Sequence, residues 1–470
     1  MTVVRLIRAG FYLTLGLSLC CSVMAAELSA ESVRAIDGIV AKALSDTGVP
    51  SASIAIVKDG RIVLAKAYGQ ARLEPAIEAT PAMRYKIASN SKQLTATAIL
   101  LLAEEHKLSL DDKVARFLPD LTRAKDVTIR EVLTHTAGYS DFYADDYVPL
   151  YMQRETTADA ILDGWAKKPL DFEPGSRWQY SNTGYVILGE IIEKVSGRKL
   201  IDFLRERVFD KLGMKSAIDI GATPWDAADP LPYTRYALGP ARIVTAEGKG
   251  WMWAAGELAM TASDLARWDI SLMRGEILKP TSLRALTTEM VLTDGTGTGY
   301  GLGLSVSQMA NGHRRWAHTG GASGFLSINV TFPDDKAAIT VLTNGEGLAF
   351  RSIEAEVESL LLAGEVDTDA EPSLERARAL FAGLQKGSVD RSSITDDLNA
   401  YFSDTVLADF GSSLGPLGEP TSFTQTSRED RGGMVHRVFT VNVGGKVLRM
   451  ETYLMPDGRF EQCLVRASAS

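Results

Sequence analysis

The sequence predicts an α+β protein whose main domain is an α-β-α sandwich, because one antiparallel sheet is drawn from both ends of a long segment. Four runs have the composition and spacing of strands: residues 53–57, 62–67, 324–332 and 337–342. Asp59-Gly60 separates the first two runs and is a strong hairpin signal. Residues 33–44 and 353–361 have helical apolar spacing, so we expect N- and C-terminal helices to flank the sheet.

An inserted, mainly helical subdomain is expected between the two halves of the sheet. Its helices are expected over residues 94–102, from a capping box at Thr128 and Glu131, over residues 185–195 and 200–209, and from a similar start at Thr261 and Asp264. Residues 219–250 carry Pro, Gly and aromatic residues without a regular period. Such a segment suits either the wall of a substrate site or a surface excursion.

An acidic, proline-terminated break over residues 364–372 predicts a linker between two domains. Residues 27–363 then form the main domain, and residues 373–470 form a small α+β domain. In the small domain we expect two helices and three strands, over residues 374–384, 398–402, 435–443, 447–453 and 460–465. This segment contains no recognisable set of catalytic residues, so an accessory role is expected for it.

Residues 1–26 have the three parts of a signal peptide. Two arginines form the basic start, residues 11–19 are apolar, and Ala25 and Ala26 precede an acidic residue. The apolar run is too short to span a membrane comfortably, and no later run reaches transmembrane length. We therefore expect cleavage after Ala25 or Ala26 and a periplasmic or secreted protein without a membrane span.

Composition argues against several functional classes. The 470-residue chain is 45% hydrophobic and 23% charged, as globular proteins are, and its length favours two domains. Its formal charge of −9 becomes −11 when the two arginines of the leader are removed, which argues against nucleic acid or anionic membrane partners. The cleaved chain keeps only Cys463, and the five His lack metal-ligand spacing, so we expect no disulfide, metal or other cofactor.

Ser89 and Lys92 are the candidate nucleophile and base. They lie three residues apart at the start of a predicted helix, so the Lys92 amine can hydrogen-bond the Ser89 hydroxyl. A serine hydroxyl is a poor nucleophile until a neighbouring base removes its proton, and a desolvated lysine can be that base. The helix N-terminus adds free backbone N–H groups and a positive dipole end, which favour an oxyanion.

Three short motifs occur in a recognisable order. They are Ser89-x-x-Lys92, Tyr180-x-Asn182 and His318-Thr319-Gly320. This order resembles the serine β-lactamase and penicillin-binding-protein superfamily, and the tyrosine of the second motif resembles its class C β-lactamase-like branch, which includes DD-peptidase, D-aminopeptidase and esterase relatives. Stretches at residues 128–138, 212–214 and 255–265 extend the resemblance over about residues 30–362.

The chemistry assigns three catalytic residues. Ser89 attacks a carbonyl carbon and becomes acylated. Lys92 takes or relays the proton, and Tyr180 passes it to the leaving group and later helps to activate water. The sequence leaves open whether Lys92 or Tyr180 is the primary base.

The resemblance also implies a set of substrate-binding residues: Asn182, His318, Thr319 and Gly320. Asn182 occupies the place where the family hydrogen-bonds both the lysine and the substrate amide. The backbone N–H groups of Ser89 and Gly321 would form the oxyanion hole. A second His-Thr-x-Gly stretch, at His135, follows a short helix, and we expect it to hold local structure.

His318 stands where β-lactamases and most DD-peptidases carry lysine. Lysine offers a permanent cation to a substrate carboxylate, whereas histidine is mostly neutral at pH 7 unless a carboxylate raises its pKa. The resemblance therefore favours the relatives with histidine here over a dedicated β-lactamase. The leading interpretation is a serine hydrolase that acts through an acyl-enzyme on an ester or a D-amino-acid amide or peptide bond of a small-molecule or peptide substrate.

Two alternatives stay open at the level of sequence. One is a true β-lactamase or DD-carboxypeptidase. The other, from a different functional class, is a penicillin-recognising sensor that is acylated without turnover. If a charged His318 recognises a substrate carboxylate, activity on such substrates should rise as the pH falls toward about 6.5. The sequence does not predict the oligomeric state.

Overall fold

The computed structural model describes residues 28–143, 147–223, 225–226, 228–309, 311–362, 370–431 and 433–467. Contacts divide the chain into two compact units, residues 1–362 and 363–470, which are described separately. The predicted signal peptide and residues 364–369 of the predicted linker lie outside the described residues. Helix α12 begins at Ala370, so the last three residues of that predicted linker are helical.

The first unit contains the predicted antiparallel sheet. Its strands, in spatial order, are β3 (Ile77–Glu78), β2 (Arg61–Arg72), β1 (Ser51–Lys58), β12 (Ala337–Thr343), β11 (Phe325–Phe332), β10 (Arg314–Ala322) and β9 (Ser305–Gln308). The β1–β2 turn places Asp59 and Gly60 at positive φ, the conformation that an Asp-Gly hairpin adopts. Ile54 of β1 lies opposite Val341 of β12, so the two ends of the unit meet in the middle of the sheet.

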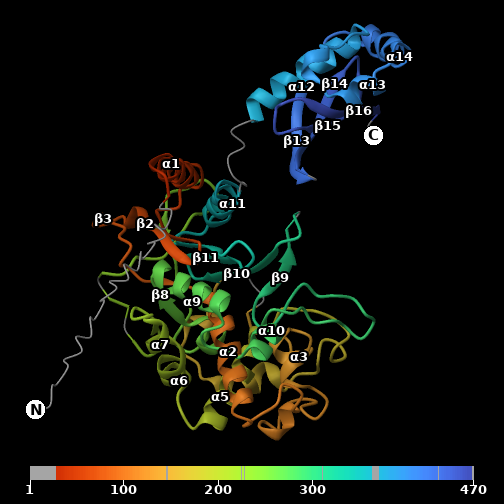
Figure 1. The fold of residues 1–470 in the computed structure, drawn as a ribbon. Coiled ribbons are helices and arrows are strands. Elements are labelled where there is room, and N and C mark those ends of the chain that lie inside the picture. Colours follow the sequence, from red (N-terminus) through yellow and green to blue (C-terminus); the bar gives the residue numbers. More distant parts are fainter. Residues whose placement is uncertain are drawn as a thin grey trace, which may run out of the picture. The chain divides into compact units, whose positions relative to one another are not determined.

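Helices cover both faces of this sheet (Figure 1). On one face α1 (Ala30–Thr47) packs against α11 (Ala349–Leu362), and Val40, Val330 and Val357 belong to their shared apolar cluster. On the other face α9 (Ala262–Arg274) packs against β1 and β12, where Ala55 and Leu342 are buried in a second cluster. The predicted α-β-α sandwich is thus confirmed.

The inserted part is mainly helical, as expected. Its helices are α2 (Ser91–Glu104), α3 (Ile129–Leu133), α4 (Ala158–Ile161), α5 (Asn182–Ser196), α6 (Leu200–Leu204), α7 (Asp210–Leu212), α8 (Trp253–Gly256) and α10 (Pro280–Leu286). Helix α2 is buried continuously from Ser91 to Leu102, which makes it the central helix of this part. The helix predicted over residues 200–209 is divided, because a π-helical turn at Arg205–Phe209 follows α6.

Two small sheets lie within the inserted part. One has the order β4 (Tyr85–Lys86), β8 (Leu258–Met260) and β5 (Ile218–Asp219), and the other pairs β6 (Tyr233–Thr234) with β7 (Arg242–Ile243). The sequence analysis does not predict these strands, because two or three residues are too few to show a period. Strand β4 matters for the site, since it leads directly into the turn that carries Ser89.

The second unit is a small α+β domain with a core of its own. It contains α12 (Ala370–Gln385), α13 (Asp396–Tyr401), α14 (Asp404–Leu414) and a sheet in the order β13 (Ser422–Arg431), β14 (Met434–Val443), β15 (Lys446–Leu454) and β16 (Phe460–Ala467). Phe381, Phe439 and Cys463 are buried in that core. Strand β13 is missing from the sequence prediction, because it is a polar edge strand with little apolar alternation.

Some features are absent from the part of the chain that the structure describes. Within it, no helix has the length and apolar character needed to cross a bilayer. It also contains no group of three or more His, Cys, Asp or Glu side chains placed to hold a metal ion. Cys463 is buried with a free thiol.

Candidate active site

Ser89 lies in a tight turn between β4 and the central helix. Strand β4 pairs with β8, and the chain then forms a single 3-10 turn over Ala88–Asn90 before α2 begins. Ala88 has a φ of +47°, a left-handed conformation that is costly for a residue with a side chain. Backbone strain of this kind concentrates at functional sites. Here the turn leaves Ser89 partly exposed at the wall of a cavity.

Lys92 is placed to act as a base toward Ser89. Its Nζ lies 3.0 Å from Ser89 Oγ, 2.8 Å from Asn182 Oδ1 and 2.7 Å from the carbonyl oxygen of Ala255. The side chain is fully buried, and this desolvation lowers the pKa of the amine to about 7. In the neutral amine, two N–H groups satisfy the amide and carbonyl oxygens, so the lone pair is left for the Ser89 hydroxyl.

Asn182 is oriented by Asp141, a residue that the sequence analysis does not single out. Asp141 Oδ1 accepts a hydrogen bond from the backbone N–H of Asn182 at 2.9 Å, and Oδ2 accepts one from Asn182 Nδ2 at 3.2 Å. Because the amide nitrogen is committed to Asp141, the amide oxygen faces Lys92. Burial raises the pKa of Asp141, and its charge raises the pKa of Lys92 against the larger effect of burial. Its only sequence signal is its position just after residues 128–138.

Tyr180 lies beside Ser89 and Lys92. Its phenol hydrogen-bonds Ser89, and Lys92 Nζ lies 4.9 Å from the centre of its ring. Desolvation raises the pKa of the phenol above its usual value, so Tyr180 is protonated at neutral pH. The His135 ring supports it at a centroid distance of 4.3 Å. The Ser89 hydroxyl therefore contacts both a proton donor, the Tyr180 phenol, and an amine of near-neutral pKa, that of Lys92.

Strand β10 approaches the Ser89 turn because Gly320 has no side chain. A Cβ at Gly320 would lie 2.2 Å from the carbonyl oxygen of Ile87 and 2.4 Å from Ser327 Oγ. Ser327, which the sequence analysis missed, donates to that carbonyl at 2.8 Å and accepts from Asn90 Nδ2 at 2.9 Å. These contacts fix both strands against the turn, and Gly321 then faces the same cavity as Ser89.

A chain of hydrogen bonds joins His135, Tyr300 and His318. His135 Nδ1 accepts from the backbone N–H of Ser181 at 3.1 Å, and its Nε2 lies 3.3 Å from the Tyr300 hydroxyl. The same hydroxyl lies 2.8 Å from His318 Nε2, and His318 Nδ1 lies 2.5 Å from the carbonyl oxygen of Thr319. All three side chains are buried. Tyr300 is not among the residues predicted from sequence.

The two ends of this chain fix the role of Nδ1 in each histidine. The backbone N–H of Ser181 only donates and the Thr319 carbonyl only accepts, so Nδ1 is an acceptor in His135 and a donor in His318. A neutral His318 then accepts at Nε2 from the Tyr300 hydroxyl. Burial, with the nearby Lys92, also lowers the pKa of His318 to about 3. Burial therefore disfavours the charged His318 that recognition of a substrate carboxylate would require.

The cavity in front of Ser89 has a volume of about 360 Å³. Its described lining is Ser89, Tyr143, Tyr180, Asn182, Met252, Gly321, Ala322, Ser323, Gly324, Phe325, Leu326 and Glu346. Of the predicted site residues, Ser89, Tyr180, Asn182 and Gly321 line it directly. Lys92 lies behind Ser89, and His318, Thr319 and Gly320 belong to the strand that borders the cavity without lining it. Within this described lining, Glu346 is the only residue with a charged side chain.

Comparison with known proteins finds relatives of this chain both in sequence and in three-dimensional structure. Protein flp of Staphylococcus aureus (strain MW2) is 26% identical over 326 residues, which cover 67% of this chain and 64% of flp, somewhat less than two thirds of its length. The D-amino acid amidase of Ochrobactrum anthropi SV3, complexed with L-phenylalanine amide, is 25% identical with a TM-score of 0.63, over 71% of this chain and 98% of that one.

A third relative matches in fold over most of the chain. The structure of the octameric penicillin-binding protein homologue from Pyrococcus abyssi has a TM-score of 0.63 at 21% identity, covering 92% of this chain and 100% of that chain. The beta-lactamase family model matches residues 36–363, which is most of the first unit. On this match and on the three motifs that meet around one cavity, the chain belongs to the beta-lactamase family, whose fold it shares with penicillin-binding proteins and D-amino acid amidases.

Proposed function

We propose that the protein is a serine hydrolase that forms an acyl-enzyme on Ser89 and cleaves an ester or a D-amino-acid amide bond. The observation that carries this proposal is the contact between Ser89 Oγ and the buried Lys92 amine, whose pKa is about 7. An amine with this pKa is substantially unprotonated at neutral pH and can accept a proton from Ser89. The surroundings of Lys92 and Tyr180 favour Lys92 as the primary base and Tyr180 as the acid.

The first half-reaction transfers the acyl group to Ser89. Lys92 takes the hydroxyl proton as Ser89 Oγ bonds to the carbonyl carbon, and the backbone N–H groups of Ser89 and Gly321 receive the oxyanion. Tyr180 then protonates the leaving alcohol or amine as its bond to the acyl carbon breaks, and it regains a proton from Lys92.

The second half-reaction returns the enzyme to its starting state. A water molecule gives one proton to the deprotonated base and adds to the acyl carbon through its oxygen. The bond to Ser89 Oγ breaks, Oγ takes back a proton, and the carboxylic acid product leaves. The net reaction is hydrolysis, with every proton returned to its original position.

The substrate class follows from the charges around the cavity. A carboxylate-bearing substrate, such as a β-lactam or a DD-peptide, needs a cation, but His318 is held neutral and Glu346 is anionic. Esters and amides of amino acids with a free amine lack this requirement. The likeness to a D-amino acid amidase supports the same choice. A β-lactamase or DD-carboxypeptidase activity is therefore the weaker candidate.

Turnover and labelling test the proposal together. The purified protein is assayed with p-nitrophenyl acetate, D-phenylalanine amide and nitrocefin, and the labelled residue is identified by mass spectrometry after a fluorophosphonate probe. We expect steady turnover of the ester and the amide, labelling of Ser89, and loss of both in Ser89→Ala. Ser91→Ala is the matched control, since Ser91 Oγ is turned toward the backbone N–H of Leu258. A single stoichiometric burst without further turnover would instead favour the alternative of a penicillin-recognising sensor, which is acylated but does not hydrolyse its ligand.

The location of the enzyme is a separate proposal. The leader-like residues 1–26 support a periplasmic or secreted protein that is cut after Ala25 or Ala26. The N-terminal sequence of the protein recovered from a bacterial periplasmic fraction tests this. Recovery of the full-length chain from the cytoplasm alone would contradict it.

A further inference from the structure

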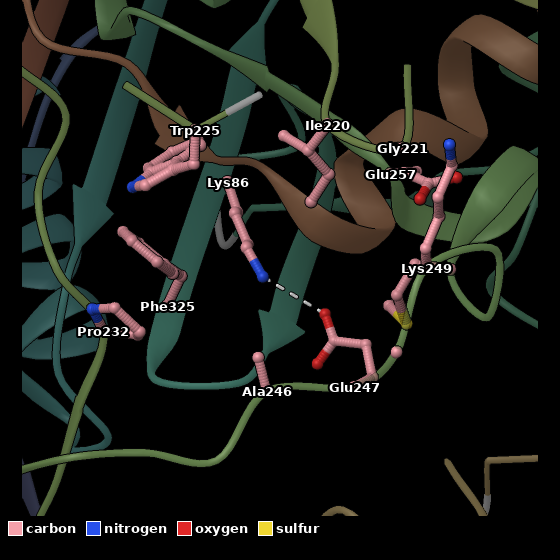
Figure 2. Close-up of a pocket in the computed structure, with 12 residues that line it drawn as sticks. Lys86, Ile220, Gly221, Trp225, Pro232, Ala246, Glu247, Lys249, Glu257 and Phe325 are labelled. Atoms are coloured by element: carbon pink, nitrogen blue, oxygen red, sulfur yellow. Dashed lines mark hydrogen bonds and ion pairs between the residues drawn. The ribbon is translucent and has the colours of Figure 1, made fainter. Parts of the chain in front are cut away.

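A second cavity adjoins the catalytic cavity. It has a volume of about 290 Å³, and Met252 and Phe325 line both cavities. Figure 2 shows Trp225 and Phe325 along one side of it and Glu257 on the opposite side, with Lys86 between them. The mechanism proposed above does not use this space. Because Met252 and Phe325 form a wall common to both cavities, a substrate bound at Ser89 can extend into the second cavity.

One side of the second cavity is an aromatic wall. The rings of Trp225 and Phe325 meet edge to face with a centroid distance of 5.6 Å. Trp225 is held in place because its Nε1 donates to the carbonyl oxygen of Pro230 at 2.8 Å. Phe325 also packs edge to face on Tyr85, next to the start of the Ser89 turn. A fixed aromatic wall favours an aromatic or branched apolar group, which buries its surface there.

The other side carries four charged side chains, two lysines and two glutamates. Lys86 Nζ binds Glu247 Oε1 at 3.2 Å, and both side chains are largely buried, so this pair is electrically neutral. Ser323, from the turn after β10, donates to Glu247 and ties the pair to the catalytic cavity. Glu257 is only 6% exposed and has no ion-pair partner among the salt bridges of the described residues.

Burial, followed by the charge of Asp219, raises the pKa of Glu257 to about 7. A carboxyl group in this state is stabilised by a hydrogen-bond donor or a cation, and it is destabilised by a second anion. The exposed Lys249 lies near the rim on the same side (Figure 2). Because Lys249 is exposed at the rim whereas Glu257 is buried and lacks an ion-pair partner among the described residues, the inner polar end of the second cavity suits an amine better than a carboxylate.

The orientation of the substrate decides which of its parts enters the second cavity. A leaving group must contact Tyr180, the residue that protonates it in the proposed mechanism. Tyr180 and Asn182 line the catalytic cavity and do not line the second one. A substituent that passes Met252 and Phe325 therefore points away from Tyr180 and belongs to the acyl part.

We propose that the second cavity is the subsite for the acyl side chain, and that it takes an aromatic or branched apolar group ending in an amine or another hydrogen-bond donor. This inference rests on the proposed function, since it needs acyl transfer to Ser89. It goes further by naming the substrate class: bulky acyl groups with a basic tip in place of short or anionic ones.

The test is a series of p-nitrophenyl esters that share one leaving group. The acyl groups are acetyl, 3-phenylpropionyl, and 3-phenylpropionyl with a para-aminomethyl or a para-carboxyl substituent. We expect kcat/KM to be highest for the aminomethyl ester and lowest, among the three bulky esters, for the carboxyl ester. Ala246→Phe places a ring at the rim that fills the second cavity. We then compare kcat/KM for the aminomethyl ester with kcat/KM for p-nitrophenyl acetate. The ratio of the first to the second should fall roughly tenfold or more in this variant.

Two controls separate this subsite from the proposed function. Thr245→Phe places the same ring on the neighbouring exposed residue, which does not line the cavity, and it should leave the ratio unchanged. Glu257→Gln removes the carboxyl charge with little change in shape and should reduce the preference for the amine over the carboxyl ester. Two outcomes refute the subsite while leaving the proposed hydrolase activity intact, provided that p-nitrophenyl acetate is hydrolysed. One is the same kcat/KM ratio in Ala246→Phe and Thr245→Phe, and the other is a preference for the carboxyl ester. If no ester is turned over or labels Ser89, the proposed function itself fails.

Discussion

The Tyr300 hydroxyl lies 2.8 Å from His318 Nε2 and donates to it, because burial keeps this histidine of the third motif in its neutral form. Lysine at this place would bring a cation, whereas a neutral imidazole already occupied at both nitrogens brings none. The partner of its Nε2 thus comes from a residue eighteen positions earlier in the chain. This relationship supports the proposal that the substrates are neutral or carry an amine.

The first prediction concerns this hydrogen bond. We expect 15N NMR of labelled histidine to show His318 as the neutral Nδ1–H tautomer between about pH 5 and 8, because its pKa is about 3. Tyr300→Phe removes the donor to Nε2 and should raise the pKa of His318. Tyr139→Phe is the control, since its hydroxyl donates to the Thr122 carbonyl elsewhere. A protonated His318 in the unmodified protein at pH 6 would overturn the direction assigned to the hydrogen-bond chain.

The second prediction is a loss of stability in acid. Burial lowers the pKa of both His135 and His318 below the value of about 6.5 expected in the unfolded chain. At these two residues the unfolded state therefore binds more protons below about pH 6.5, and the contribution of each histidine to the free energy of unfolding should fall by up to roughly 1.4 kcal/mol per pH unit. Above that pH this contribution to stability is fully present.

Tryptophan fluorescence during urea unfolding measures this slope in the first unit, because all seven tryptophans precede residue 363. His318→Asn should reduce the slope, whereas Tyr139→Phe, which removes no histidine, should not. A slope between pH 7.5 and 5.5 that is the same in His318→Asn as in the unmodified protein would show that His318 takes up its proton in the folded state.

The sequence predicted the sandwich and the three motifs for physical reasons that can be stated. Strands β1, β11 and β12 are long and apolar, and the capping box at Thr128 leaves a local signature. Asp141 and Tyr300 were missed because each acts through contacts with residues that are not its neighbours in the chain. Such a contact has no period and no local pattern.

The charge state of His318 could not be predicted for the same reason. Histidine titrates close to neutral pH in water, so its state depends on burial and on its hydrogen-bond partners. The motif identifies the residue, but it does not reveal that Tyr300 donates to it. The second cavity was anticipated only as one of two options for residues 219–250, which contribute Ile220, Trp225 and Pro232 to its lining.

The third prediction compares a glycine beside the Ser89 turn with a glycine far from the site. Gly320→Ala puts a Cβ 2.2 Å from the carbonyl oxygen of Ile87, so β10 must move away from the Ser89 turn. We expect kcat/KM to fall by at least about a hundredfold, because small displacements at a catalytic site are that costly. Gly38→Ala is the control, because a Cβ at Gly38 in α1 meets no atom within 4 Å. Equal activity of the two variants would show that the close approach of β10 is not needed.

The fourth prediction concerns the second unit. Every residue assigned to the catalytic and second cavities belongs to the first unit. A chain that ends at Leu362 should therefore fold and react with a fluorophosphonate at Ser89 at a rate close to that of the full chain. Circular dichroism and the labelling rate are the measurements. A truncated chain that is folded but does not label would show that the second unit completes the active site.

The fifth prediction is a pH profile set by Lys92 and Asp141. Lys92 must be unprotonated to act as a base, so kcat/KM for a neutral ester should rise with pH, with an inflection near the Lys92 pKa of about 7. The negative charge of Asp141 raises that pKa. Asp141→Asn should therefore move the inflection to lower pH. Its plateau should also fall, because Asn182 loses one of its two acceptors.

Asp163→Asn is the control for the Asp141 substitution, since it removes an equal charge from an exposed ion pair with Lys167. It should leave both the inflection and the plateau unchanged. The shift in Asp141→Asn separates its electrostatic effect on Lys92 from a purely structural one, because loss of orientation alone lowers the plateau without moving the inflection. An inflection that moves to higher pH would mean that a group other than Lys92 limits the rate in acid.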